Sequence, residues 1–168
     1  FFVRAVYRMG EKINFMATLR REGSSRFGED NKWGFFPSAS VGFRATDDIR
    51  VRASFGVTGN QEIGNYRSLV TLGPGSNAVI GGVLLTGVSA NQLANPDLKW
   101  ENTSDMNLGV DFVLMDGKIT GTVDMYSKTT EDMLVEVNVP QPAVVTTKLD
   151  NVGSVENKGF ELSLNSEI

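Results

Sequence analysis

The sequence contains neither cysteine nor histidine in its 168 residues. The absence of cysteine excludes disulfide bonds, zinc–thiolate sites and thiol catalysis. The absence of histidine removes the commonest general base, so a Ser-His-Asp triad cannot be assembled within the chain. No serine is followed by a lysine at the Ser-x-x-Lys spacing of serine–lysine catalysis. Together these absences argue against an enzyme.

An excess of positive charge and a long apolar run are also missing. The net charge of -4 and the pI of about 4.9 argue against a nucleic-acid partner, which would require a clustered basic face. No stretch approaches the roughly 20 apolar residues of a transmembrane helix, although a membrane barrel gives a far weaker signal per strand. No signal peptide is evident, because the residues from Phe1 onward already have a strand pattern. We therefore expect the chain to be a piece of a longer protein.

What the sequence does contain is a series of period-two apolar stretches, the pattern of half-buried β-strands. Most are close to the roughly 9–11 residues that cross a bilayer at a tilt, rather than the 5–6 of an ordinary strand. The predicted strands are residues 1–9, 13–22, 36–45, 49–58, 104–114, 118–127 and 156–165. The sequence thus predicts an all-β, antiparallel fold.

The connections between these strands alternate between very short and very long. The short ones are residues 10–12, 46–48 and 116–117, and the long, polar ones lie near 23–35, 59–103 and 128–155. Successive connections in an antiparallel sheet lie at opposite ends. One end of the sheet therefore carries only the short turns, and the other carries the long connections. Bacterial outer-membrane barrels have this asymmetry, with short periplasmic turns and long extracellular loops. Alternation of apolar and polar residues alone does not distinguish such a barrel from a soluble β-sandwich. The asymmetry of the connections favours the barrel.

Each predicted strand separates into an apolar row and a polar row, because successive side chains point to opposite faces. In 49–57, for example, the apolar row begins with Ile49 and Val51 and the polar row with Arg50 and Arg52. In a barrel, the polar rows would line a wet lumen. We expect Arg52, Asp111 and Asp124 to face it, since a bilayer would not tolerate their charges.

Aromatic residues gather where strands meet the long connections. Phe35 and Phe36 are predicted to join an interfacial aromatic girdle. Trp33, Tyr66 and Trp100 lie further from the strands and are predicted to pack in a core formed by the loops.

Several glycine and proline motifs are interpreted as structural. Residues 73–77 are glycine-rich but lack the Gly-Lys-Ser/Thr of a phosphate-binding loop, and are predicted to form a flexible outer loop. Gly56, Gly59 and Gly64 are predicted to end a strand and turn the chain, and 157–159 to open the last strand from a turn. Residues 67–94 could form short extra strands within an outer loop.

No residue is assigned a catalytic, metal-binding or cofactor-binding role. The acidic pairs Glu29-Asp30, Asp47-Asp48 and Glu131-Asp132 lack the alternating spacing of a calcium loop and lie at predicted turns. Substrate-binding residues are not identified by the sequence.

A set of motifs in a fixed order covers nearly the whole chain. These motifs are Arg20–Gly28, Phe36–Ser38, Val51–Asn60, Ile63–Tyr66, Asn95–Glu101, Asn107–Phe112, Asp124–Tyr126, Thr130–Leu134 and Asn151–Glu161. In sequence and order they resemble the SusC/RagA family of TonB-dependent outer-membrane transporters.

The resemblance implies a transmembrane barrel of about 22 strands with a plug in its lumen, in the Gram-negative outer membrane. Residues 1–168 would supply about seven or eight of those strands, without the plug or the TonB box. It also implies energy from the TonB complex, a SusD-like surface lipoprotein over the extracellular loops, surrounding outer-membrane lipid, and an oligosaccharide or peptide substrate.

Two other functions remain as alternatives at this point. A soluble β-sandwich carbohydrate-binding module would bind glycans through exposed Trp33 or Trp100. A hydrolase would require a rigidly held nucleophile or carboxylate pair, which the sequence does not offer. Import of nutrients through an outer-membrane barrel ranks first.

Overall fold

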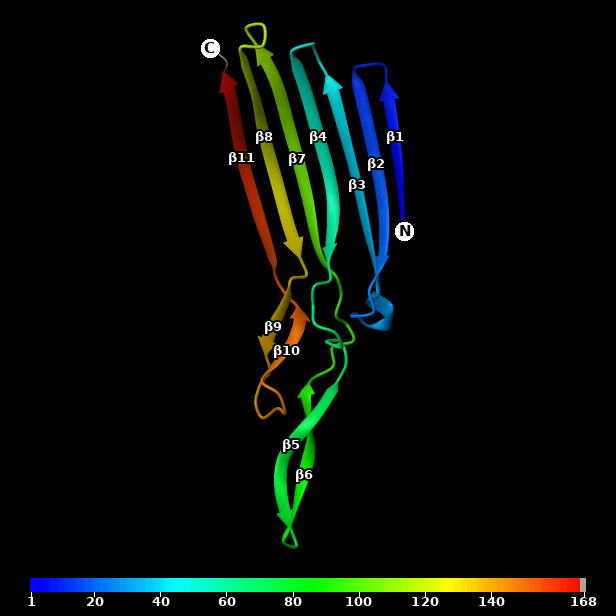
Figure 1. Cartoon of the computed structure of the whole chain (residues 1–168), viewed down its shortest axis with the longest axis vertical. Helices are drawn as coiled ribbons and strands as arrows, with labels where there is room; N and C mark the ends of the chain where they lie inside the picture. The colour runs from blue at the N-terminus through cyan, green and yellow to red at the C-terminus, as the bar shows by residue number, and fades with distance from the viewer. Residues whose placement is uncertain (167–168) are drawn as a thin grey trace.

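Seven long strands form one antiparallel sheet in the computed structural model, which describes residues 1–166 (Figure 1). The order across the sheet is β1-β2-β3-β4-β7-β8-β11. The strands are β1 (Phe2–Met9), β2 (Ile13–Gly23), β3 (Trp33–Arg44), β4 (Ile49–Asn60), β7 (Glu101–Leu114), β8 (Ile119–Glu131) and β11 (Ser154–Ser166). The predicted all-β antiparallel fold and the seven predicted strands are confirmed. Several strands continue further toward the long connections than predicted.

The short and long connections lie at opposite ends of the sheet, as the sequence predicts. In Figure 1 the short turns are at the top and the long connections at the bottom. The long connections contain the 3-10 helix η1 (Glu29–Asn31) and two hairpins. These hairpins are formed by β5 (Thr71–Ile80) with β6 (Val83–Gln92), and by β9 (Leu134–Asn138) with β10 (Thr147–Asn151).

The β5–β6 hairpin confirms that residues 67–94 contain extra strands, and it projects furthest from the sheet (Figure 1). Its turn is Gly81-Gly82, with φ of 62° and 78°. Two successive positive φ angles match the twist of a two-residue hairpin turn, which glycine adopts without strain. Residues 73–77, predicted to be a flexible loop, instead belong to β5, with a register shift between Pro74 and Asn77. Pairing with β6 orders this segment despite its glycines.

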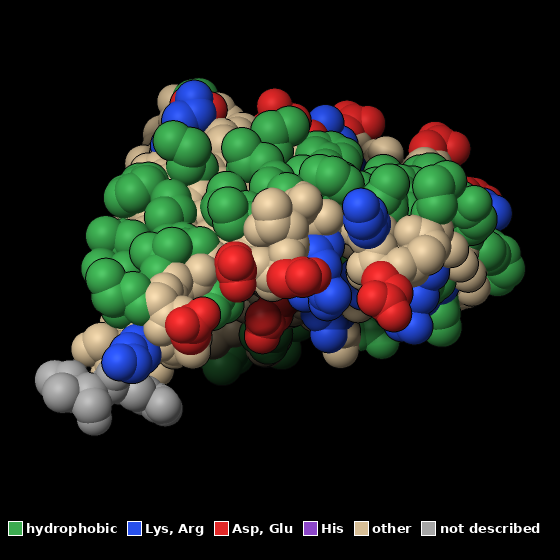
Figure 2. Space-filling view, turned by 90° about the horizontal axis from the view of Figure 1, so that it is seen from above, with side chains coloured by type: hydrophobic (Ala, Val, Ile, Leu, Met, Phe, Trp, Pro, Cys, Tyr) green, Lys and Arg blue, Asp and Glu red, His purple; other side chains and the backbone are tan. Residues whose placement is uncertain are grey.

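One face of the seven-stranded sheet is a continuous apolar surface. The register places Val51, Val110, Val123 and Leu162 side by side across β4, β7, β8 and β11. Leu108 and Leu162 remain 49% and 56% exposed. Figure 2, seen from the end with the short turns, shows a band of hydrophobic side chains on one side of the molecule and a group of charged side chains on the other, with further charges at the outer margin. A β-sandwich would bury such a face against a second sheet, so the structure does not favour that alternative.

The buried core lies at the loop end and not along the sheet. It consists of Phe27, Phe36, Ile63, Leu98 and Trp100. Val57, Leu134 and Leu149 pack against it from β4 and the β9–β10 hairpin. Within residues 1–166 no helix has the length and apolar character needed to cross a membrane.

The predictions for the aromatic residues were partly wrong. Trp100 is in the loop core as predicted, but Trp33 and Tyr66 are 62% and 67% exposed. Phe36, predicted for a girdle, is only 3% exposed and belongs to the core. The reason is strand parity: Phe36 lies opposite Arg20 on the polar-row face, over which the loops close, whereas Trp33 and Phe35 alternate to the other face. Phe35 is exposed, and its girdle role stays a prediction.

Three glycine interpretations were also wrong. Gly56 and Gly59 lie inside β4, which continues to Asn60, and 157–159 lies inside β11. Each of these glycines faces a neighbouring strand and does not turn the chain. Gly64 lies between β4 and β5, outside the strands, as predicted.

Candidate functional site

The polar face of the sheet carries a three-residue ion network. Arg52 of β4 donates to both carboxylate oxygens of Asp111 on β7, from Nε at 2.9 Å and from Nη2 at 3.0 Å. Its Nη2 also donates to Asp124 of β8 at 3.2 Å. Gly109, between Arg52 and Asp124 in the register, leaves the space that the guanidinium crosses. The network therefore ties three strands together on the face where the sequence analysis placed these charges.

Charge is divided along this polar face. Most of the arginines lie on the half formed by β1 to β4, and most of the carboxylates on the half formed by β7, β8 and β11; Glu22 of β2 and Lys128 of β8 are the exceptions. These arginines include Arg4, Arg8, Arg44, Arg50 and Arg52, and these carboxylates include Asp105, Asp111, Asp124 and Glu161. The Arg52 network joins the two halves where β4 meets β7.

At the loop end, Phe36 and Trp100 pack edge to face, with ring centroids 5.3 Å apart. Gly34 and Gly59 flank them, and a Cβ added at either position would overlap the ring of Phe36 and approach Trp100. Phe27 also packs against Trp100, with ring centroids 5.3 Å apart. The glycines thus have a packing role: they make room for the aromatic core at the base of the loops.

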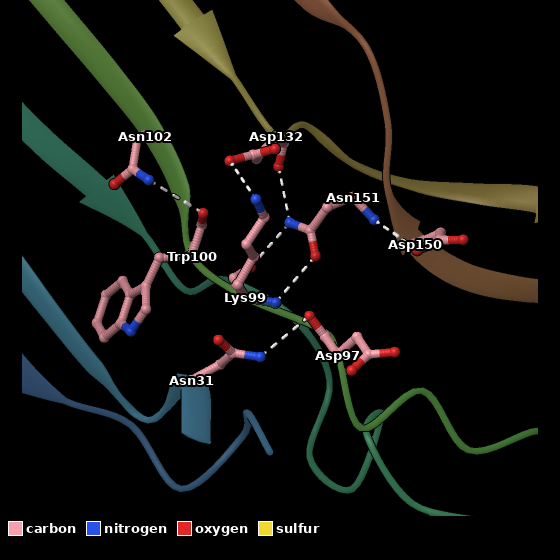
Figure 3. Close-up of polar contacts among 8 residues, drawn as sticks. All are labelled: Asn31, Asp97, Lys99, Trp100, Asn102, Asp132, Asp150 and Asn151. Atoms are coloured by element: carbon pink, nitrogen blue, oxygen red, sulfur yellow. Dashed lines mark hydrogen bonds and ion pairs between the residues drawn. The ribbon is translucent and has the colours of Figure 1, made fainter. Parts of the chain in front are cut away.

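The side chain of Asn151 links the loops by three hydrogen bonds (Figure 3). Its Nδ2 donates to the backbone carbonyls of Lys99 and Asp132, both at 2.8 Å. Its Oδ1 accepts the backbone N–H of Lys99 at 2.9 Å. The Lys99 ammonium in turn pairs with the Asp132 carboxylate at 2.9 Å. One asparagine therefore joins the segments that lead into β7, out of β8 and out of β10.

Asn95 and Asp150 make a second link between the same loops. The buried Asn95 amide donates to the backbone carbonyl of Leu149 at 2.9 Å and to the Asp150 carboxylate at 3.0 Å. The hydrogen bond from the Lys148 ammonium holds the pKa of Asp150 below its ordinary value, with further lowering from Asn95 and from the backbone N–H of Asn151. Partial desolvation opposes the shift without reversing it. Asp150 is thus held as a carboxylate.

Further contacts connect β9, the start of β5 and the β2–β3 connection to the rest of the loop end. Glu101 accepts hydrogen bonds from the Asn60 amide at 3.2 Å and from the Leu134 backbone N–H at 3.1 Å. Arg67, just before β5, pairs with Glu136 of β9 at 3.0 Å. The N–H of the Trp100 indole donates to the carbonyl of Lys32 at 3.3 Å, which adds the β2–β3 connection. We call this whole assembly the loop junction: the aromatic core together with these polar links.

The structure separates the residues that the sequence analysis considered for metal binding. Glu29-Asp30 lies in η1, Asp47-Asp48 in the β3–β4 turn, and Glu131-Asp132 at the end of β8. In residues 1–166 no group of three or more acidic side chains is placed to hold a metal ion.

Sequence reasoning identified Trp100 but missed the polar residues of the loop junction. Asn95, Glu101 and Asn151 stand at the edges of quoted motifs, but their partners are distant along the chain. The signal in the sequence that could have identified them is a set of polar side chains directly beside the strand boundaries. Such residues commonly bond to backbone groups that the strands leave unpaired.

The β5–β6 hairpin has no charged residue, and neither do the segments that join it to Arg67 and Asp97. Near its tip the apolar side chains are exposed on both faces of the ribbon: Val79, Ile80, Val83, Leu84 and Leu85. Large contiguous apolar surfaces of this kind mark sites of interaction. An apolar hairpin thus projects from the loop junction (Figure 1).

Comparison with known proteins gives a consistent picture. The family model described as "TonB dependent receptor-like, beta-barrel" matches residues 1–167. TonB-dependent receptor P39 of Formosa agariphila is 36% identical over 97% of this chain, and TonB-dependent receptor SusC of Bacteroides thetaiotaomicron is 34% identical over 99% of it. The chain spans 16% and 18% of the length of these two relatives.

Solved structures agree with the sequence relatives. The RagAB peptide importer in its "closed-closed" state matches 99% of this chain with a TM-score of 0.85 and 32% identity. The chain covers 19% of that structure's matched chain. Both the seven-stranded sheet and its loop-end elements are therefore similar to a known assembly over nearly their full extent.

Proposed function

The chain belongs to the SusC/RagA family of TonB-dependent receptors, and from this premise we propose that its sheet is part of the barrel wall of an outer-membrane nutrient importer. The remaining strands, the plug and the TonB box would lie in the rest of a longer polypeptide, since the chain spans under a fifth of its relatives' length. A barrel of about 22 strands with a plugged lumen is the architecture of such transporters.

The observation that carries this proposal is the exposed apolar face. From Ile49 to Val57 the apolar row of β4 runs along roughly 26 Å of strand, at about 3.3 Å per residue. Tilted by about 40°, such a strand crosses most of the roughly 25 Å apolar band of an outer-membrane barrel. The opposite face, with Arg52, Asp111 and Asp124, would then line the water-filled interior. The charges stay hydrated and the hydrocarbon meets only apolar side chains.

The orientation follows from the connections. Short turns mark the periplasmic end of such barrels and long loops the extracellular end. The loop junction and both hairpins would therefore lie outside the cell. The substrate would be an oligosaccharide or a peptide. The similarity to a peptide importer supports a peptide, and the similarity to SusC leaves an oligosaccharide open.

The first experiment is to fractionate cell envelopes and detect the native polypeptide that carries this sequence. We expect a product several times heavier than 18.3 kDa in the outer membrane. Deleting the gene should abolish growth on the imported nutrient, and an energy-uncoupled TonB complex should give the same defect. A soluble product near 18.3 kDa would contradict the proposal.

The β5–β6 hairpin is the proposed docking element for a SusD-like surface lipoprotein. Its uncharged, exposed tip supports this, because an apolar ribbon outside the membrane needs a protein surface to cover it. Replacing Val79 and Leu84, which face each other across the hairpin, with aspartate should abolish co-purification of the lipoprotein.

The matched control replaces Asn77 and Thr86, a neighbouring cross-strand pair, with aspartate. This variant adds the same charge to the hairpin but removes no apolar side chain, so the lipoprotein should still co-purify. Equal loss in both variants would show that added charge alone, and not the apolar tip, is responsible. Retention in both would exclude the hairpin as the docking element.

A further inference from the structure

We propose that Arg8, Arg44 and Arg50 form a carboxylate-binding site on the polar wall of the sheet. The occupants are aspartate or glutamate side chains from a part of the same polypeptide outside these 168 residues. The proposal rests on the proposed function, because it requires the polar face to enclose a lumen that other parts of the chain can enter.

The register places the three arginines on the same face of the sheet. Arg44 of β3 lies directly opposite Arg50 of β4. Arg8 of β1 lies on the same face, in line with Asn14 and Gly42. Like charges directly opposite each other destabilise a pair of strands. An arginine pair in this position is therefore favourable only where an anion offsets the repulsion.

The carboxylates that the chain itself offers do not pair with these arginines. Asp47 and Asp48 of the β3–β4 turn border a second hollow with Arg44 and Arg50, but within residues 1–166 they form no ion pair with them. Asp111 lies opposite Arg50 in the register, but both of its oxygens accept hydrogen bonds from Arg52. The Arg50 guanidinium turns instead toward β3, with Nη2 3.3 Å from the position a Cβ would take at Gly42. Within residues 1–166 no ion pair is formed by Arg8, Arg44 or Arg50.

The arginines surround a hollow of about 840 Å³ on the face of the sheet. Arg8, Arg44, Arg50 and Arg52 line it, together with a single acidic residue, Glu11 of the β1–β2 turn. Glu11 makes no ion pair with the arginines in the described part of the chain. Guanidinium groups bind carboxylates through paired, charge-assisted hydrogen bonds. The hollow therefore has the size and the charge to receive more than one carboxylate side chain.

The location favours an occupant from the same polypeptide. The hollow includes Gly10 and Arg44, and so lies at the end with the short turns, far from the loops by which a substrate would enter. The chain spans 16% of the P39 receptor and 19% of the matched RagAB chain, so most of such a polypeptide lies outside it. In barrels of this size the lumen holds a plug. A tethered plug reaches the site at a high effective concentration, which a free anion does not.

The test uses the full-length protein purified from the outer membrane. The R44K and R50K variants keep the positive charge and provide an amine, which a zero-length carbodiimide cross-linker joins only to a carboxylate in contact with it. We expect mass spectrometry to identify a peptide that joins position 44 or 50 to an aspartate or glutamate outside residues 1–168. The matched control is R4K, because Arg4 lies on the same face of β1 but outside the hollow; it should give no such peptide.

Three results would overturn the proposal: cross-links only to acids within the chain such as Glu11, the same peptides from R4K, or no cross-link. If an R44Q/R50Q variant loses uptake of an anionic substrate while no cross-link forms, the arginines serve the substrate and the proposal also fails. Missing cross-links in a correctly located, active transporter would remove only this inference. Absence of the wild-type protein from the outer membrane would remove the proposed function itself.

Discussion

At the scale of single residues, the space left by glycine decides how the loop end is packed. Gly34 and Gly59 lie against Phe36 and Trp100, where a side chain would occupy the volume of the rings. Gly56, three positions earlier on the same strand, has only the Cβ of Ser38 nearby, at 3.4 Å from the Cβ it would carry. Two glycines of one strand thus have different roles, which only their neighbours reveal.

Replacing Gly59 with alanine should destabilise the protein by about 1–3 kcal/mol, the usual cost of overpacking a filled core. The added methyl group overlaps the Phe36 ring, so the ring must move against Trp100. The measurement is the unfolding free energy of the full-length protein in detergent. G56A is the matched control and should leave stability nearly unchanged, since its methyl group meets an ordinary contact distance. Equal effects would contradict the packing role of Gly59.

At the scale of elements, the loop junction joins three connections that are far apart in the sequence. Asn151 bridges the chain before β7 and the chain after β8, and Glu101 bridges β4 and β9. Most of these links use a side chain to satisfy a backbone group, and the hydrogen bond between Asn60 and Glu101 joins two side chains. The hairpins are therefore fixed at their bases and exposed at their tips.

An Asn151→Ala substitution should loosen the β9–β10 hairpin without unfolding the sheet. Three hydrogen bonds are lost, at roughly 0.5–1.5 kcal/mol each. Hydrogen exchange should show faster exchange of the Lys99 amide and of the β9 and β10 amides, and no change in β7 or β8. Q141A, whose side chain bonds only within the hairpin's own loop, is the control and should leave the Lys99 amide protected.

The β10 element should also respond to acid. The Asp150 pKa is lowered by Lys148, so its stabilising effect is fully present above its ordinary pKa and is lost as pH falls through the lowered value. Hydrogen-exchange protection of β9 and β10, corrected for intrinsic rates, should therefore fall as pH drops below about 4. In D150N this protection should be lower at neutral pH and should change little with acid. An unchanged pH profile in D150N would exclude Asp150 as the responsible group.

At the scale of the whole molecule, the two faces of the sheet face different solvents in the proposed barrel. Leu162 and Ser163 are neighbours on β11 that point to the apolar and polar faces respectively. An arginine near the bilayer midplane on the lipid-facing side costs about 2–4 kcal/mol. We expect L162R to lower the amount of folded full-length protein in the outer membrane strongly, and S163R to have little effect. Equal effects of the two substitutions would contradict the assignment of the faces.

The local pattern predicted the strands well because alternation is a property of the backbone itself. The row from Ile49 to Val57 and the short turns could be identified without any knowledge of neighbours. Where prediction was wrong, as at Phe36, Trp33 and Gly59, a residue's role depended on which face of its strand it occupied and what closed over that face.

The sequence by itself determined the all-β class, the seven long strands, the asymmetry of the two ends and the separation of apolar and polar rows. Each of these follows from a repeat of two residues and from local turn chemistry. Only the tertiary structure decided that Asn151 bonds to Lys99, that Arg44 lies opposite Arg50, and that Phe36 lies between two glycines. These contacts join segments that are distant along the chain or depend on how strands pair, and a local sequence pattern carries no record of strand pairing.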